Sequence, residues 1–406
     1  MFISVILKNK RNRKMPLAVF ALALGAFAIS TTEFVILGLL LNVSQDFGIS
    51  ISDAGFLVTA YAIGVVIGAP LLTPILARYP RKKVIVFLLA LFTIGNAIAV
   101  FAPNYETLLF SRVFTALVHA SFYGLSSIVA SQLVSKDKQA RAMSMVFMGA
   151  TIANIAGAPL GTMIGLEFGW RSTSIACAIL GFLAMIGISL LVPKVKTEKP
   201  KNIAAEFRTL LQPQVIRALL LTLVGFAGTF TLLTYIAPLL IQLTGFVEGE
   251  ISMMLFIFGL GMAIGNPIGG WLTDKDLKLA LNTTLGFLFV ILIAIGLLSS
   301  YMIPMYVLTF LFGAALFATI TPLQVNAMIA AGDAPVMAAS FNIAAFNLAN
   351  ALAAVIGGYV IDSSLGINFL PFAAASFALL GLAFALSTQK RSTKSEVGES
   401  MSSTST

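Results

Sequence analysis

The residue with the clearest chemical potential is Glu33, which lies inside a long apolar stretch of the chain. The other 15 of the 16 acidic residues fall in polar loops, in tails or at the ends of apolar segments. An ionised carboxylate in hydrocarbon is costly, so an acid inside a membrane segment is a candidate functional group with a partner to be found. A carboxyl group held between apolar surroundings and a nearby cation can take up and release a proton, as a proton-coupled carrier requires.

Arg112 and the single histidine, His119, are the candidate partners of Glu33. Counted from the outer ends of their apolar segments, Glu33 lies about 12 Å deep and Arg112 about 8 Å deep, at about 1.5 Å per residue. These depths allow an ion pair. His119 follows Arg112 by two helical turns on the same face and is expected near the middle of the membrane. A fixed structural ion pair, and a packing role for His119, are the alternatives to proton coupling.

Aromatic and amide side chains of several apolar segments could line a substrate cavity. Amides in membrane helices can contact substrates, but they often only hold helices together. The chain has 32 phenylalanines, so contact with lipid or with the protein core is the simpler interpretation for each ring. The candidate lining residues are Phe27, Phe122, Asn154, Phe230, Gln324, Asn342 and Phe346.

The fifth apolar segment contains the stretch Gly157-Ala158-Pro159-Leu160-Gly161. Small residues at four-residue spacing let neighbouring helices approach closely, and proline removes a main-chain hydrogen bond and can bend a helix. Gly157, Pro159 and Gly161 are therefore candidates for a hinge. Simple close packing is the alternative, and it is compatible with a hinge.

These residues need a scaffold that crosses a membrane, and the composition predicts one. The chain has 406 residues, 59% hydrophobic and only 10% charged, with a mean hydropathy of +0.99, whereas soluble domains carry about 25% charged residues. A helix needs about 20 apolar residues to cross the bilayer. Twelve windows qualify, at residues 16–41, 53–76, 84–102, 107–133, 142–165, 172–192, 215–241, 250–272, 279–299, 303–328, 335–361 and 367–388.

The apolar segments form two copies of one unit. Five pairs share an offset of 197 residues: Gly64 with Gly261, Gly68 with Gly265, Pro70 with Pro267, Gly161 with Gly358 and Gly169 with Gly366. A fixed offset over some hundred residues indicates internal duplication, and duplicated membrane proteins are often transporters. The predicted parts are a basic cytoplasmic tail (1–14), a first six-helix half (15–192), a cytoplasmic linker (193–214), a second six-helix half (215–388) and a disordered cytoplasmic tail (389–406).

Lysine and arginine predict the orientation of the chain. With the N-terminus inside, 23 of the 25 basic residues fall in inner loops and tails, as the positive-inside rule requires. Both termini are therefore expected to be cytoplasmic, and this bias explains the pI near 9.7 without a nucleic-acid partner. In residues 1–14 the basic residues follow the apolar start, which is not the order of a signal peptide.

Several function classes are excluded by what the sequence lacks. One cysteine, Cys177, and one histidine rule out an internal disulfide, a thiolate metal cluster and a histidine-rich metal site. The sequence has no GxxxxGK[ST] motif for an ATP-driven pump, and one histidine in mid-membrane does not suit a serine–histidine–acid set. We therefore expect no enzyme activity, no cofactor and no metal.

The two halves and the basic loop after the second segment resemble the major facilitator superfamily over about residues 15–390. The family's loop motif, G-x-x-x-D-R-x-G-R-K, falls on residues 73–82. Thr73, Ala77 and Pro80 depart from it, so the acid that the family is thought to use as a cytoplasmic latch is missing at Ala77. The resemblance implies a cytoplasmic gate that contains Arg78, Arg81, Lys82, Asp274 and Lys275.

Further motifs narrow the resemblance. Arg112 matches the arginine of the family's fourth helix, which is implicated in proton transfer. The stretch 157–161 is similar to the antiporter motif, with one residue inserted between glycine and proline, and Gly169-Trp170-Arg171 opens the sixth segment as in drug:proton antiporters. Strings such as Thr31-Thr32-Glu33-Phe34 resemble the arabinose-efflux-permease-like branch of that group.

The expected fold is an all-α membrane protein with 12 transmembrane helices in two pseudo-symmetric halves. The resemblance implies a proton-coupled antiporter that exports a drug or a sugar- or nucleoside-like molecule across a bacterial inner membrane by alternating access. Its expected partners are a small-molecule substrate, protons and the lipid bilayer, with no nucleic acid, and a monomer is the state that the resemblance implies. Two alternatives remain: an uptake symporter or facilitator for a sugar, and a non-transporting membrane sensor.

Overall fold

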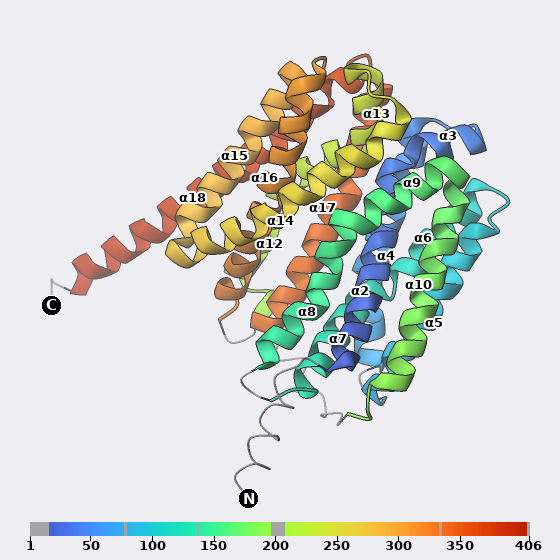
Figure 1. Cartoon of the computed structure of the whole chain (residues 1–406). Helices are drawn as coiled ribbons and strands as arrows, with labels where there is room; N and C mark the ends of the chain where they lie inside the picture. Colours follow the sequence, from blue (N-terminus) through green and yellow to red (C-terminus); the bar gives the residue numbers. More distant parts are fainter. Residues whose placement is uncertain (1–15, 77–78, 136–137, 196–207, 333–334, 404–406) are drawn as a thin grey trace, which may run out of the picture. The chain divides into compact units, whose positions relative to one another are not determined.

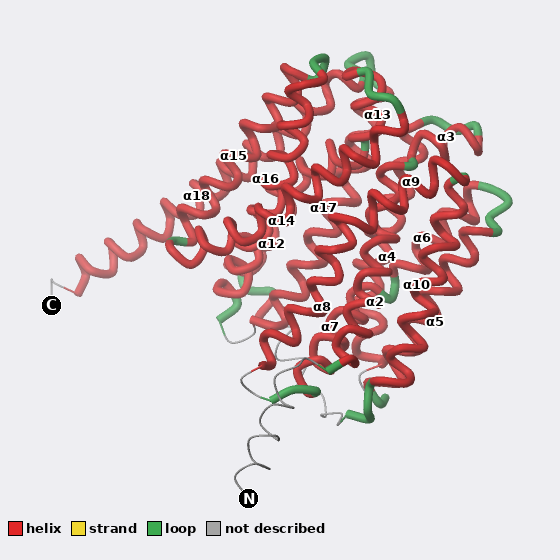
Figure 2. The backbone as a smooth tube through the Cα atoms, viewed as in Figure 1, coloured by secondary structure: helices red, strands yellow, loops and turns green. Residues whose placement is uncertain are grey.

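The structure is a computed structural model that describes residues 16–76, 79–135, 138–195, 208–332 and 335–403. Within these ranges all regular structure is helical (Figure 2). Twelve helical stretches of the described chain are long and apolar enough to cross a membrane, and each overlaps one of the twelve predicted segments. The predicted all-α membrane fold is therefore confirmed, because hydropathy and segment length suffice to indicate membrane helices.

The first six segments contain several interruptions (Figure 1). Their elements are α2 (Leu17–Val35), the 3-10 turn η1 (Ile36–Gly38), α3 (Leu40–Phe47), α4 (Ile51–Leu76), α5 (Arg81–Val100), α6 (Tyr105–Ala116), α7 (His119–Gln132), α8 (Gln139–Ile152), the π turn η3 (Ala153–Gly157), α9 (Ala158–Phe168) and α10 (Trp170–Leu191).

The last six segments follow the linker. Their elements are α12 (Pro213–Thr234), α13 (Ile236–Leu239), the π turn η4 (Leu240–Thr244), the 3-10 turn η5 (Glu248–Glu250), α14 (Ile251–Lys275), α15 (Leu277–Leu298), α16 (Met302–Ala330), α17 (Pro335–Asp362), the 3-10 turn η6 (Ile367–Phe369) and α18 (Leu370–Ser403).

Two of the helix interruptions lie next to a proline. The π turn η3 comes just before Pro159, and α12 ends at Thr234, four residues before Pro238. Proline lacks the N–H that would bond the carbonyl four residues earlier, and its ring clashes with that carbonyl. The local helix therefore widens into a π turn at the first site and ends at the second.

The helix α18 is longer than predicted. The sequence predicts the last membrane segment over 367–388 followed by a disordered tail, whereas α18 continues to Ser403. The segment 389–403 contains no proline and includes lysine, arginine and glutamate, which are good helix formers. Polarity alone therefore does not end this helix.

Contacts divide the chain into two compact units, and the division does not follow the sequence repeat. Unit 1 holds the described residues of Met1–Val35 and Ile67–Pro200, and unit 2 holds those of Ile36–Val66 and Lys201–Thr406. The segment 36–66 thus belongs to the first sequence repeat but packs with helices of the second. The domain boundaries that the repeat predicts stay a prediction.

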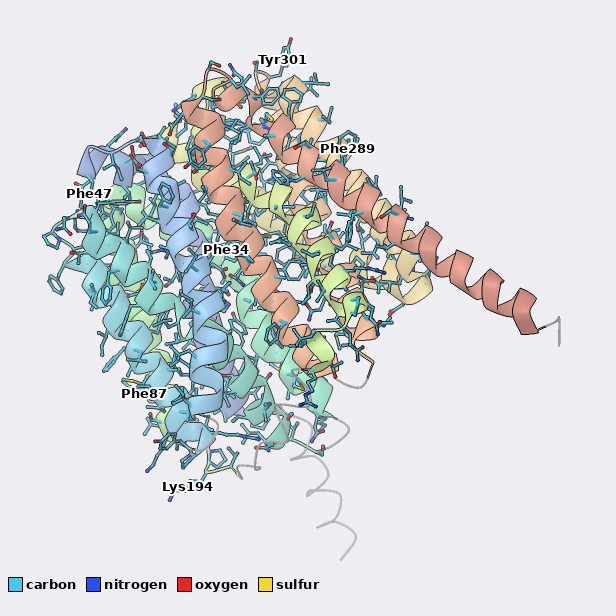
Figure 3. The ribbon with its side chains drawn as sticks, turned by 180° about the vertical axis from the view of Figure 1, so that it is seen from behind. Phe34, Phe47, Phe87, Lys194, Phe289 and Tyr301 are labelled. Carbon is cyan, nitrogen blue, oxygen red and sulfur yellow. The ribbon has the colours of Figure 1, made fainter. Side chains whose placement is uncertain are left out.

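Unit 1 is built around α2. This helix packs against α8, α9 and α10, and α10 packs in turn on α5. Leu22, Ile29, Leu88 and Phe92 are among the fully buried side chains of its core. On the outer surface of α5 the apolar side chain of Phe87 is half exposed (Figure 3), which suits a helix whose outer face contacts lipid tails.

Unit 2 has two main sets of helix contacts. The helices α14 and α16 form one closely packed pair, and α12 packs against both α17 and α18. The contact of α12 with α17 has a regular register, since Thr222 meets Asn342 and Phe226 meets Phe346, each 120 residues further along the chain. The two helices therefore run side by side in the same direction.

One helix contact recurs in both repeats. A Cβ atom on Gly68 of α4 would overlap the carbonyl oxygen of Leu117, and a Cβ on Gly265 of α14 would overlap that of Ala314. The two glycines, like the two carbonyls, differ by the repeat offset of 197 residues. The repeated glycines are therefore explained by packing, since only a residue without a side chain fits where two helix backbones touch.

Candidate functional site

Glu33 lies at the broken end of a membrane helix. The helix α2 ends at Val35, two residues after Glu33, and gives way to the turn η1. The last carbonyl groups of an α-helix need donors from outside the helix. Arg112 of α6 supplies them, because its Nη1 donates to the Thr32 carbonyl at 2.7 Å and its Nη2 to the Glu33 carbonyl at 3.3 Å. The buried guanidinium thus caps α2, where the helix dipole also favours a cation.

The side chain of Glu33 faces His119. Its Oε2 lies 3.9 Å from the Nδ1 of His119, and both side chains are mostly buried, with 16% and 13% exposed. His119 is the first residue of α7, directly after the break at 117–118 in the fourth segment. Gly68 contacts the backbone of Leu117 at this break. The repeated glycine contact therefore lies beside the turn that presents His119 to Glu33.

The structure brings the predicted partners Glu33 and Arg112 together. The two hydrogen bonds of the Arg112 guanidinium described above go to the main-chain carbonyls of Thr32 and Glu33. The imidazole of His119, the second predicted partner, lies 3.9 Å from the carboxylate. A depth estimate from helix rise places residues in one layer, but it cannot tell a side-chain acceptor from a main-chain one.

Sequence reasoning missed a second polar layer around this site. The Ser30 and Tyr123 hydroxyls are 2.7 Å apart, and Tyr123 also donates to the Ala26 carbonyl at 2.9 Å. The ring centres of Tyr123 and His119 lie 5.0 Å apart. Tyr123 follows His119 by four residues, a spacing that places both on one helix face. That spacing is the signal that could have found it.

The hydroxyl next to Glu33 in sequence is also held by a partner on another helix. The Thr32 hydroxyl donates to the Asn96 side chain on α5 at 3.3 Å, and Asn96 donates to the Phe92 carbonyl at 3.0 Å. The end of α2 is therefore fixed from two sides, by Asn96 and by the guanidinium of Arg112.

The site contains one acid, one permanent cation and one imidazole in an apolar bundle. Such a set can hold a proton on Glu33 or His119 and change its net charge when the proton leaves. No group of three or more histidine, cysteine, aspartate or glutamate side chains that could bind a metal occurs in the described part of the chain. The arrangement is suited to proton binding and release.

The predicted hinge residues pack directly on this end of α2. A Cβ on Gly157 would overlap the Thr31 hydroxyl, and one on Gly161 would lie 2.7 Å from the Val35 side chain. Pro159 lies between them in the first turn of α9, just after the π turn η3. The structure therefore places the irregular part of the fifth segment against the turn that carries Glu33.

The predicted cavity residues of unit 1 are mostly buried in helix contacts. Phe122 is fully buried, and its ring fills the space that a side chain on Gly25 would need. Phe27 is partly buried and packs next to Gly157. Asn154 donates to the Ala150 carbonyl at 3.1 Å within its own segment. The structure thus shows packing or hydrogen-bonding contacts for all three residues, which is the alternative interpretation of them.

The predicted cavity residues of unit 2 form two neighbouring groups between α12, α16 and α17. Asn342 accepts from the Thr222 hydroxyl at 2.7 Å and donates to Gln324 at 2.8 Å. One turn further along α17, the ring centres of Phe346 and Phe226 lie 4.6 Å apart, and Phe230 is next to Phe226. Asn342 and Gln324 thus bind each other across helices, which satisfies part of their hydrogen-bonding capacity.

The predicted gate residues lie at helix ends. Arg78 is outside the described residues. Arg81 and Lys82 are partly buried in the first turn of α5, while Asp274 and Lys275 are exposed in the last turn of α14. The Lys275 ammonium lies 3.6 Å from the ring centre of Trp271.

Sequence comparison identifies the family of this chain. Residues 22–337 and 248–404 match the Major Facilitator Superfamily. The inner membrane transport protein YdhP of Escherichia coli (strain K12) is 42% identical over 91% of this chain and 95% of its own length. The protein AraJ of the same organism is 32% identical over 90% of this chain and 94% of its own length.

A third relative carries a name that refers to a drug. The chloramphenicol resistance protein of Streptomyces lividans is 30% identical over 87% of this chain and 91% of its own length. The similarity to AraJ agrees with the predicted likeness to the arabinose-efflux-permease-like branch.

The fold is also similar to that of solved transporters. The crystal structure of a D-xylose-proton symporter superimposes with a TM-score of 0.72 at 15% sequence identity and covers 91% of this chain and 96% of that one. This likeness concerns the fold alone. The helix count, the repeat and the sequence matches agree, so the chain belongs to the major facilitator superfamily and is a membrane transporter, not an enzyme.

Proposed function

We propose that this protein is a proton-coupled antiporter that exports small organic molecules across a bacterial inner membrane by alternating access. The observation that carries the proposal is the Glu33 carboxyl group, which lies inside a membrane segment 3.9 Å from His119 and at a helix end capped by Arg112. An acid in this setting is expected to serve a function rather than the fold.

The position of Glu33 suggests how a proton could act on the rest of the molecule. A proton on Glu33 removes the negative charge that attracts the guanidinium of Arg112. Arg112 holds the end of α2, and directly after Val35 the chain passes from unit 1 into unit 2. In this proposal, loss of the charge changes the contacts of Arg112 with the end of α2. The chain continues from this end into residues 36–66 of unit 2. Protons favour the inward-facing state and substrate competes for the same state, and each acts through a difference in its affinity for the two states, since only such a difference can shift a conformational equilibrium.

The names of the relatives favour export across an inner membrane. One relative at 42% identity is named an inner membrane transport protein, and one at 30% identity is named for chloramphenicol resistance. We propose the same membrane for this chain, with both termini cytoplasmic as the basic loops predict. The substrate is proposed to be a drug or a sugar- or nucleoside-like molecule, and the functional state a monomer.

The remaining predicted sites have proposed roles within this function. Phe27, Phe122, Asn154 and the group around Asn342 would contribute surfaces to the substrate path, in addition to the packing contacts that support their positions. The basic residues at the start of α5 would form the cytoplasmic gate together with the charged residues at the end of α14. The π turn before Pro159 would be the hinge next to Glu33.

The test is export from energised cells against a divided panel. One half of the panel holds chloramphenicol and the cationic dye ethidium, and the other holds arabinose, xylose and inosine. Each compound is measured with and without a protonophore, in cells that make the protein, its Glu33→Gln variant or the matched variant Glu106→Gln. Glu106 is an exposed acid in the first turn of α6, so it controls for loss of a carboxylate as such.

The proposal predicts export that the protonophore abolishes, that Glu33→Gln loses and that Glu106→Gln keeps, with equal amounts of each protein in the membrane. Full export by Glu33→Gln would show that this carboxylate is not the coupling group. Accumulation of a compound above the level in control cells would reverse the proposed direction and favour the uptake symporter.

A further inference from the structure

Two asparagine side chains of α17 have buried amide oxygens without a hydrogen-bond donor. Asn347 and Asn350 are only 7% and 6% exposed, and neither Oδ1 atom accepts a hydrogen bond from any residue that the structure describes. The Nδ2 group of Asn347 is bound, since it donates to the Ile343 carbonyl at 3.0 Å. Burying a polar atom without a partner costs free energy. The two oxygens are therefore candidate contacts for a molecule from outside the fold.

The third asparagine of α17 differs from these two. Asn342 accepts from the Thr222 hydroxyl at 2.7 Å and donates to Gln324 at 2.8 Å. These two bonds join α17 to α12 and α16. Helix packing thus accounts for the amide of Asn342, whereas it does not account for the oxygens of Asn347 and Asn350.

The two oxygens belong to one strip of α17, because residues three apart share a helix face. Asn347 lies one turn before Ala351, whose carbonyl accepts a hydrogen bond from α4. Asn350 lies one turn after Phe346, whose ring contacts α12. The strip therefore faces the space between α4 and α12, and all three helix stretches belong to unit 2.

Phenylalanine rings lie next to the strip on the side of α12. The ring centre of Phe226 lies 4.6 Å from that of Phe346 and 5.8 Å from that of Phe230. Partners on α12 and α17 differ by 120 residues, and this register places Phe230 level with Asn350. Ligand sites commonly combine such apolar walls with a few polar atoms that fix orientation. A molecule that fits here has an apolar or C–H face beside an edge with hydrogen-bond donors.

The helices around the strip carry charges only near their ends. In sequence, α16 has no acidic or basic residue, α12 has none after Arg217, and α17 has only Asp362 at its last position. The single charged residue of α4 is Asp53, in its first turn. A cation in apolar surroundings needs a counter-charge, and amide oxygens supply only partial charges. The strip therefore suits neutral donors such as hydroxyl and amide N–H groups.

We propose that Asn347 and Asn350 bind the transported molecule through their amide oxygens, and that this molecule is neutral, with hydroxyl or N–H donors next to an apolar or C–H face. The inference rests on the proposed function, since it names the class of molecule that the exporter carries. Within the panel it selects chloramphenicol, arabinose, xylose and inosine, and it excludes the cation ethidium. It does not depend on Glu33 or on a proton.

The first measurement is thermal unfolding of purified Asn347→Leu and Asn350→Leu in detergent. Leucine is similar in size and shape to asparagine but has no unpaired oxygen, so the midpoint of each variant is expected to equal or exceed that of the wild type. Asn342→Leu is the matched comparison. It leaves the Thr222 hydroxyl and the Gln324 side chain without their partner, so its midpoint is expected to fall.

The second measurement is binding of each radiolabelled panel compound to the purified protein at a single pH. At least one neutral compound is expected to bind about tenfold or more tightly than ethidium. Asn347→Leu and Asn350→Leu are each expected to weaken that binding about tenfold, the value of one buried hydrogen bond. Asn42→Leu is the matched control and should bind as the wild type does, because Asn42 lies on α3 and donates to Glu248 at 3.4 Å.

Several results would overturn the inference. Midpoints of Asn347→Leu and Asn350→Leu as low as that of Asn342→Leu would mean that the two oxygens serve the fold. Leucine variants that bind as tightly as the wild type would mean that the oxygens contact only water. Ethidium binding as tightly as every neutral compound, or no binding of any neutral compound, would show that the ligand class is wrong.

These failures can be distinguished from a failure of the proposed antiport, because none of the measurements involves a proton gradient. Binding of a neutral compound that both leucine variants weaken supports the inference even if the cells show no protonophore-sensitive export. That combination would overturn the antiport and leave the binding site in place.

Discussion

At the scale of single residues, the most informative contact is the one between Arg112 and the end of α2. The guanidinium donates to the carbonyl groups of both Thr32 and Glu33. Arg112 therefore has two roles. Its guanidinium caps the end of α2, and it places a positive charge near the Glu33 carboxyl group. This geometry requires the fork of an arginine, because a lysine ammonium is a single point charge.

Substituting Arg112→Lys separates these two roles. The variant keeps the charge but loses one of the two carbonyl contacts, so we expect a free energy of unfolding lower by about 1.5–3 kcal/mol, the value of a hydrogen bond to a charged group. We also expect loss of most transport. The measurements are thermal unfolding of the purified protein in detergent and export of whichever panel compound the wild type exports.

Arg171→Lys is the matched control for this substitution. Arg171 also donates to a main-chain carbonyl, that of Ala102 at 3.2 Å, but it lies away from Glu33 at the start of α10. If Arg112→Lys and Arg171→Lys had the same effect on transport, the capping of α2 would have no special role.

The main residues of the site were predictable from the sequence, but not all of their contacts were. Charged groups in apolar segments are rare, so Glu33, Arg112 and His119 could be found without a structure. Ser30 and Tyr123 are harder to single out, because hydroxyl groups are common in membrane helices and many bond only to their own helix. Only the tertiary contact between α2 and α7 shows that these two hydroxyls meet.

At the scale of helices, the twelve segments were predictable and their interruptions were mostly not. Hydropathy over about 20 residues decides where a membrane helix lies. The π turn near Pro159 had a local signal in the proline. The breaks after Val35 and at 117–118 had none, because they coincide with contacts to residues far away in sequence, Arg112 in the first case and Gly68 in the second.

The repeated glycine contact gives a prediction for both halves. Gly68→Ala and Gly265→Ala would each push a methyl group into a helix backbone. We therefore expect each to lower the free energy of unfolding by about 1–3 kcal/mol, as overpacking does. The measurement is the midpoint of thermal unfolding of each purified variant.

Glycines with free space around them provide the controls, one in each repeat. A Cβ on Gly124 would meet no atom within 4 Å, and one on Gly286 would have its nearest neighbour at 3.9 Å. Alanine at these two positions should leave the midpoint unchanged or raise it. A midpoint for Gly68→Ala or Gly265→Ala that matched these controls would show that the backbone contact is not tight.

At the scale of the whole molecule, the two sequence repeats and the two compact units divide the chain differently. The repeat is read from a fixed offset between matching residues, whereas the units reflect which helices touch. The sequence could not show that residues 36–66 pack with the second repeat, because neither hydropathy nor spacing contains information on partners between helices.

A disulfide between residues 36–66 and the second repeat should stop transport. In Ser52→Cys/Gly358→Cys, which joins α4 to α17, the Cβ atoms would lie 3.1 Å apart, below the about 3.5–4.5 Å of a disulfide, so the two helices must move slightly apart when the bond forms. Oxidation is expected to abolish export of the panel compound that the wild type exports, and dithiothreitol is expected to restore it. Thiol counting on the denatured protein measures the extent of cross-linking.

The control pair joins two helices of one repeat. In Ala21→Cys/Gly187→Cys, on α2 and α10 of unit 1, the Cβ atoms would be 3.4 Å apart. Oxidation of this pair should leave export intact. Continued export by a fully cross-linked Ser52–Gly358 pair would rule out separation of α4 from α17 as a step of transport.

The central claim is that a proton at Glu33 drives the movement of substrate, and it is tested most directly with purified protein in liposomes. The measurement is uptake of the exported panel compound into vesicles with an imposed pH gradient. With an acid interior, the antiport account predicts accumulation as protons leave, and it predicts none for Glu33→Gln under the same gradient. Accumulation that required an acid exterior instead, or that was equally strong in Glu33→Gln, would contradict the account.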